Sequence, residues 1–112
     1  MPFDPTATDS TPHGAPLVPV LPIRLRNTEI LTVVYRTDPA AADALIPAPL
    51  KLAGDLCVVH VYRMHDAEWF GRYCESAFQI PVVMPDGTQA VYSPFLVLES
   101  DGAVSAGREL YG

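Results

Sequence analysis

The chain has 112 residues, 49% apolar and 18% charged, which suits one small domain with its own core and excludes a disordered chain. A net charge of -6 with seven scattered basic residues argues against nucleic acid or an anionic membrane surface as the partner. The sequence shows neither a secretory signal pattern nor an apolar run of the roughly 20 residues that a membrane-spanning helix needs. With only two cysteines, we expect a protein of the reducing cytoplasm that binds a small molecule.

The first segment, residues 1–22, contains half of the chain's prolines, mixed with small polar residues. Each proline fixes its φ angle and removes a backbone hydrogen-bond donor. This composition predicts an extended or flexible arm. The folded domain is therefore expected over residues 23–112.

Two strands are predicted first, at residues 23–26, which alternate apolar and basic, and at residues 29–37, which are rich in β-branched and aromatic side chains. Asp38 is a suitable helix N-cap, and Pro39 fits the first helical position. We therefore expect a helix of about two turns, ended by the prolines that follow. Residues 50–54 are then expected to turn the chain back.

The next predicted strand, residues 56–64, is followed by a polar stretch that contains His65, Asp66 and Glu68. Imidazole and carboxylate groups are common zinc or iron ligands, and His60 is nearby in the sequence. Their spacing matches no established ligand motif. We expect a polar loop here and no metal.

Glu75 lies in the middle of a stretch, residues 71–81, that otherwise resembles a buried strand. In an extended chain Tyr73, Glu75, Ala77 and Gln79 share one face, since alternate side chains point the same way. This face could be the solvent-exposed side of a sheet, as is usual for carboxylates. It could also be a polar-lined interior, where burial and neighbours tune the carboxyl pKa for acid or base chemistry.

A hairpin is predicted after this strand, with its turn at residues 85–88 and a return strand at residues 89–99. Pro94 cannot donate to a ladder and so indicates a sheet edge or a bulge. Residues 100–102 are expected to form a further turn. Four or five strands with one short helix give a mostly β, or α+β, fold class. Several strands are apolar on both faces and need covering on both sides, so we expect this domain to be part of a larger one.

Four motifs, in this order and spacing, resemble the N-terminal part of the acetoacetate decarboxylase family. They are Val34-Tyr35-Arg36-Thr37-Asp38, Met64-His65-Asp66, Glu75-Ser76 and Gly107-Arg108-Glu109-Leu110. Each motif alone is weakly specific, but all four stand in register. The resemblance covers residues 27–112, nearly all of the chain outside the arm and about the first half of a family member.

The resemblance implies part of a cone-like, largely β barrel that assembles into a homo-oligomer and uses no cofactor. It also implies a lysine that forms a Schiff base with a keto acid, whose iminium nitrogen accepts the electrons of the breaking bond. In the family this lysine follows the match to residues 107–110, after an aromatic residue and a proline. We therefore expect it beyond Gly112, in a C-terminal half of the same polypeptide. The 112-residue chain alone should be inactive, because its only lysine, Lys51, has no neighbouring cation.

The resemblance assigns catalytic roles to Glu75 and His60, and substrate-binding roles to Arg108, Tyr111 and Thr28. Glu75 matches the family glutamate that faces the Schiff base, while Arg108 and Tyr111 lead into the lysine turn. Thr28 stands where the decarboxylases usually carry an arginine that holds the substrate carboxylate, and it offers no charge. His60 replaces a second glutamate and can act as both acid and base near neutral pH, although a core histidine is the ordinary interpretation.

The leading hypothesis is therefore a decarboxylase-like Schiff-base lyase that acts on a small keto acid. His60 keeps open an aldolase-dehydratase that acts on a 2-oxo acid with the same scaffold. A third hypothesis, of another class, is a non-catalytic keto-acid-binding or truncated module, because the nucleophile is not among these residues.

Overall fold

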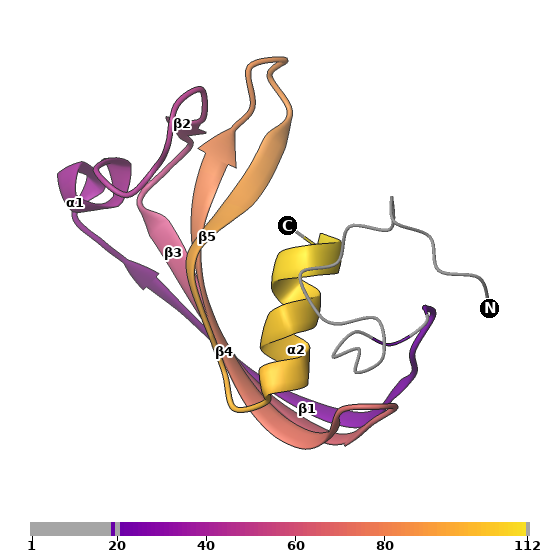
Figure 1. Ribbon diagram of the computed structural model, residues 1–112. Helices are drawn as coiled ribbons and strands as arrows, with labels where there is room; N and C mark the ends of the chain where they lie inside the picture. The colour runs from indigo at the N-terminus through magenta and orange to yellow at the C-terminus, as the bar shows by residue number, and fades with distance from the viewer. Residues whose placement is uncertain (1–18, 20, 112) are drawn as a thin grey trace, which may run out of the picture.

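The computed structural model describes Pro19 and residues 21–111, and its strands form one five-stranded antiparallel sheet. The elements in chain order are β1 (Leu25–Arg36), α1 (Pro39–Asp43), β2 (Lys51–Leu52), β3 (Leu56–Ala67), β4 (Gly71–Val83), β5 (Gln89–Leu98), α2 (Asp101–Ala106) and the π-helical turn η1 (Gly107–Tyr111). The mostly β class predicted from the sequence is confirmed (Figure 1). The arm predicted for residues 1–22 lies almost wholly outside the described residues.

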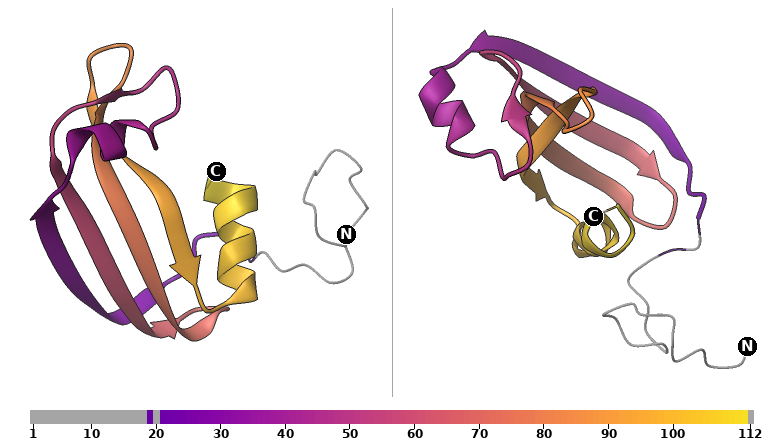
Figure 2. Two further views of the ribbon diagram at one scale, coloured as in Figure 1. Left: turned by 90° about the vertical axis from the view of Figure 1, so that its left-hand side faces the viewer. Right: turned by 90° about the horizontal axis from the view of Figure 1, so that it is seen from above.

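The sheet has the strand order β1-β3-β4-β2, with β5 also paired to β4. It is strongly bent, and α2 lies within its concave side (Figure 1). The two helices pack at different ends of the sheet (Figure 2). Each end has its own core cluster: Ala42, Cys57 and Ile80 beside α1, and Met64, Ala67, Tyr73 and Ala103 beside α2.

One continuous strand, β1, replaces the two strands predicted before the first helix. It pairs with β3 from Leu25 opposite Ala67 to Arg36 opposite Leu56. Asn27 within it has a φ of 54°, a left-handed conformation that asparagine tolerates better than most residues. Pairing with β3 therefore keeps the chain in one strand through residues 27–28, the polar residues that separate the two predicted strands.

The helix signal at Asp38 is confirmed. The Asp38 carboxylate accepts a hydrogen bond from the backbone N–H of Ala40 at 3.0 Å, and Pro39 is the first residue of α1. The helix itself is shorter than expected, because it covers only residues 39–43.

Two segments that were expected as loops are strands. Residues 51–52 form β2 and pair with the end of β4, although two residues are too few to produce a recognisable alternation. The polar stretch after Met64 continues β3 as far as Ala67. There Asp66 forms an ion pair with Arg26 at 3.3 Å, so the polar side chains contact the neighbouring strand. Polar composition alone indicated a loop, but cross-strand pairing keeps this segment extended.

The turn predicted at residues 85–88 is confirmed, with Gly87 at a φ of 86°. β5 then returns antiparallel to β4, and the register between them shifts between Phe78 and Ile80. Pro94 lies on β5 at this irregularity. The predicted bulge therefore occurs where the missing N–H of proline costs no ladder hydrogen bond.

The C-terminal segment departs most from the prediction. Residues 100–102 were expected as a turn, but they begin α2, and η1 continues the helix. The Ser100 hydroxyl caps α2 by accepting a hydrogen bond from the backbone N–H of Ala103 at 3.3 Å. Ala103 and Ala106 are buried against the sheet, so tertiary packing stabilises a helix whose glycines lower its intrinsic propensity. No helix within residues 21–111 is long and apolar enough to cross a membrane.

Large apolar side chains remain exposed on β1 and β5, each of which pairs with a single strand among the described residues. They include Ile30, Leu31, Val34, Val91, Phe95 and Val97. This exposure agrees with the apolar character of both strand faces in the sequence. Apolar surface of this kind is typical of a face that another layer or chain covers.

Candidate functional site

Glu75 lies on the concave face of the sheet, at the centre of β4. The strand register places Tyr62 of β3 and Leu98 of β5 directly opposite it. Its neighbours on the same face, Tyr73 and Ala77, are 7% and 4% exposed. The face that Glu75 shares is therefore an interior face and not the solvent-exposed side of a sheet.

The second wall of the site comes from α2 and η1, which lie across this concave face (Figure 1). Ala103 of α2 belongs to one cluster with Met64 and Tyr73, and Leu98 packs against the cluster. Small alanine side chains let the helix lie close to the sheet. This approach fixes where η1, and with it Arg108 and Tyr111, stands relative to Glu75.

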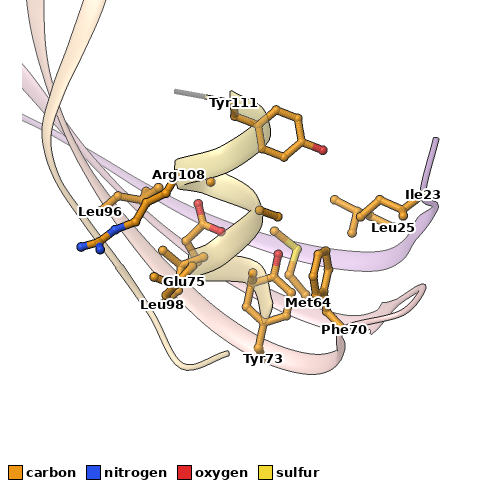
Figure 3. A pocket seen from close by; sticks show the side chains of 14 residues that line it. Ile23, Leu25, Met64, Phe70, Tyr73, Glu75, Leu96, Leu98, Arg108 and Tyr111 are labelled. Atoms are coloured by element: carbon orange, nitrogen blue, oxygen red, sulfur yellow. The ribbon is translucent and has the colours of Figure 1, made fainter. Parts of the chain in front are cut away.

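Between these walls lies a cavity of about 610 Å³. Glu75, Arg108 and Tyr111 line it, together with the ring of Tyr73 (Figure 3). Most of the remaining lining is apolar and includes Ile23, Leu25, Met64, Phe70, Leu96 and Leu98. The cavity is thus an apolar hollow with one carboxylate, one guanidinium and two phenols, a composition usual for small-molecule sites.

Burial raises the pKa of the Glu75 carboxyl above its ordinary value. The pKa of the Tyr73 phenol is also raised, first by burial and then by the nearby charges of Glu75 and Tyr111. Tyr73 therefore stays a neutral hydrogen-bond donor at neutral pH. A partly desolvated carboxyl beside it can exchange a proton with a bound molecule more readily than an exposed one.

His60 and Thr28, the other two predicted site residues, do not line this cavity. His60 stands next to Tyr62 on the Glu75 face, with ring centroids 5.5 Å apart, and its Nδ1 is hydrogen-bonded to the Thr32 hydroxyl at 2.9 Å. The Thr28 hydroxyl donates to the sulfur of Met64 at 3.5 Å. Thr28 thus contacts a lining residue without lining the cavity itself. His60 pairs with Ala77, two residues along β4 from Glu75.

The polar residues that were considered as metal ligands are engaged in other contacts. The His65 ring is 2.7 Å from a carboxylate oxygen of Glu29, and Glu68 accepts a hydrogen bond from the backbone N–H of Arg24. The His65 contact, with a smaller contribution from Arg63, lowers the pKa of Glu29. Among the described residues, no group of three or more His, Cys, Asp or Glu side chains could hold a metal ion.

The sequence model of the family described as acetoacetate decarboxylase matches residues 1–112. The chain belongs to the acetoacetate decarboxylase family. It is 40% identical over 101 residues to acetoacetate decarboxylase 2 of Mesorhizobium japonicum, and 38% identical over the same length to the acetoacetate decarboxylase of Chromobacterium violaceum. Each match covers 90% of this chain.

A solved structure of acetoacetate decarboxylase has the same fold as this chain, with a TM-score of 0.83 and 35% sequence identity over 92% of the chain. That structure confirms the acetoacetate decarboxylase type of fold. The chain spans 42% of that protein, and 38% and 41% of the two curated relatives. These relatives are named as acetoacetate decarboxylases, so the chain belongs to a family that contains carbon–carbon lyases.

Sequence reasoning placed Tyr73 on the Glu75 face but gave it no role, and it did not foresee the helical wall. The sequence did contain a signal for this helix, a serine suited to an N-cap followed by an acidic residue in the first turn. Met64 was visible as part of a family motif, but its place in the cavity depends on the register of β3 against β4. Register is set by long-range pairing, which spacing within one strand does not reveal.

Proposed function

We propose that this chain is the glutamate-bearing portion of a Schiff-base lyase of the acetoacetate decarboxylase type, acting on a small keto acid. One observation carries the proposal: Glu75, with its raised pKa, lies in an apolar cavity that η1 also lines, in a member of this family. The expected lysine would follow Tyr111, itself a lining residue, so a short continuation of the chain would bring it to the cavity.

The reaction begins when the neutral lysine amine adds to the keto carbonyl and water leaves, which forms an iminium. The bond to the carboxylate then breaks, carbon dioxide departs, and the electron pair moves to the iminium nitrogen to give an enamine. Protonation of the enamine carbon and hydrolysis of the imine release the ketone and the lysine. Glu75 would supply or accept the protons in these steps.

The apolar walls support this chemistry in two ways. Burial disfavours the ammonium form of a lysine, which leaves more of the amine neutral and nucleophilic. Removing water also strengthens the attraction between the iminium and the Glu75 carboxylate. Acetoacetate decarboxylase is the standard example of a lysine activated by a neighbouring cation. In the family a second lysine directly follows the Schiff-base lysine, and here that second lysine would be the cation.

For the substrate carboxylate we propose contacts with Arg108 and Tyr111 at the cavity rim. The Arg108 guanidinium is exposed and, in Figure 3, points away from Glu75. Binding by Arg108 would need a change of its rotamer, which an exposed side chain permits. Thr28 would contribute no charge, and its hydroxyl would help to position Met64, to which it donates a hydrogen bond.

A second candidate is an aldolase-dehydratase on a 2-oxo acid, favoured by the hydrogen bond between His60 and Thr32. That contact orients the His60 ring on the same face as Glu75, where it could serve as a second acid or base. A non-catalytic keto-acid-binding module remains the third candidate.

We expect the protein to act as a cytoplasmic homo-oligomer. Light scattering would test the oligomeric state, and cell fractionation would test the location.

Reductive trapping separates the three candidates. The polypeptide that joins residues 1–112 to the predicted lysine is incubated with acetoacetate or pyruvate and reduced with borohydride, and the adduct is located by mass. A lysine adduct with release of carbon dioxide supports the decarboxylase, and an adduct with aldol products supports the aldolase. Binding without any adduct would leave only the binding module.

A further inference from the structure

The cavity extends well beyond the end that contains Glu75, where the proposed chemistry takes place. It extends along β4 from Glu75, which faces Leu98 of β5, to the turn before Gly71, where Phe70 lines it. Four strand residues correspond to about 13 Å at the usual rise. In Figure 3 the Glu75 carboxylate and the Phe70 ring accordingly lie on opposite sides of Tyr73.

The two ends of the cavity differ in chemistry. Among the described residues that line it, only Glu75 and Arg108 are charged, and both are at one end. The other end is lined by Ile23, Leu25 and Phe70, which offer only carbon atoms to a ligand. The ring of Phe70 is held edge-on to Tyr73, with centroids 6.3 Å apart, so this apolar end has a defined wall.

A keto acid as short as acetoacetate would occupy the charged end and leave the apolar end to water. The cavity volume of about 610 Å³ is within the range that holds drug-sized ligands. Water against mainly apolar walls is displaced favourably by an alkyl chain. We propose that the substrate is a keto acid with an apolar chain longer than methyl, placed with its carboxylate and keto group near Glu75 and its tail toward Leu25 and Phe70.

This inference rests on the proposed Schiff-base function for its orientation, but not for the apolar subsite itself. Each methylene of the alkyl tail should add a similar amount of binding free energy until the tail passes Leu25. Leu25 is 49% exposed and marks where the cavity opens to solvent. Each methylene buried before that point should raise affinity about fourfold.

The first test measures kcat/KM for decarboxylation of acetoacetate and of its straight-chain homologues extended by two and by four methylenes, with the lysine-bearing polypeptide. We expect kcat/KM to rise about fourfold per methylene. Leu25→Trp, which fills the apolar end, should reduce the ratio of long-chain to short-chain kcat/KM at least tenfold. Leu31→Trp on the same strand, an exposed position outside the cavity, should keep the ratio of the wild type. A series that is flat or falls with chain length would overturn the proposal, as would a Leu25→Trp ratio equal to that of the wild type.

The second test separates failure of the subsite from failure of the chemistry. Butanol, hexanol and octanol cannot form an imine, so their affinities, measured by ligand-observed NMR, report only on the apolar end. Affinity that rises about fourfold per methylene and is lost in Leu25→Trp supports the subsite even where no keto acid is trapped. Equal affinities for the three alcohols would refute it, even where decarboxylation is observed.

Discussion

The cap of α2 offers a direct test of how the site is built, through the single change Ser100→Ala. This change removes the hydroxyl that accepts the backbone N–H of Ala103 and leaves that N–H without its cap. Loss of an N-cap typically costs about 0.5–2 kcal/mol. The bond here, at 3.3 Å, is slightly long, so we expect the lower half of that range, about 0.5–1 kcal/mol. For a domain of this size that corresponds to a fall in Tm of roughly 2–8 °C.

The assay combines thermal unfolding with amide hydrogen exchange. Because the cap acts on one end of one helix, amides of α2 should exchange faster, while those of the paired strands β3 and β4 should change little. Ser100→Asp, which restores an acceptor and adds a favourable charge at the helix start, should recover the Tm. Ser105→Ala within α2 is the matched control. An unchanged Tm together with unchanged α2 exchange in Ser100→Ala would refute the view that this cap holds the cavity wall in place.

Further predictions concern Glu75, Met64 and Lys51. Since burial raises the pKa of Glu75, the folded chain binds more protons than the unfolded chain, and this group's contribution to stability falls as pH rises through the folded pKa. Glu75→Gln should therefore unfold at a higher temperature than wild type at pH about 7, with the gap closing below the ordinary glutamate pKa of about 4.3. Equal pH profiles would contradict this. Met64→Ala should lower the free energy of unfolding by about 2–5 kcal/mol in chemical denaturation, because Met64 is buried against α2, and a change under about 0.5 kcal/mol would show that the cluster is not packed. The 112-residue chain should form no borohydride-stable adduct at the exposed Lys51, and mass spectrometry that finds one would reverse this prediction.

Local sequence signals predicted those parts of the fold that depend on a few neighbouring residues. The Asp38 cap, the turn with Gly87 and the bulge at Pro94 each follow from the backbone chemistry of one or two side chains. Alternation likewise placed Tyr73 and Ala77 on the face of Glu75. These features need no knowledge of what packs against them.

The features that sequence reasoning missed depend on long-range contacts. β2 exists because Leu52 pairs with Val82, some thirty residues away. α2 is stabilised because Ala103 packs in one cluster with residues of β3 and β4. Residues 107–110 were recognised as a family motif, but not as part of a helical segment. The candidate site residues could therefore be proposed from the sequence. The helical wall that faces Glu75 could be recognised only from the tertiary fold.

Turnover by Glu75→Gln in the lysine-bearing polypeptide tests the central claim most directly. The amide keeps the size of the side chain but removes its acid and base function, which typically costs about a hundred- to ten-thousand-fold in rate, while borohydride should still trap the imine. Glu99→Gln is the matched control, because that exposed glutamate lies outside the cavity and glutamine can still accept the backbone N–H of Cys74. Loss of turnover in Glu75→Gln alone, with imine formation intact, is the predicted result. Turnover equal to that of the wild type would show that Glu75 does not manage the protons of this reaction.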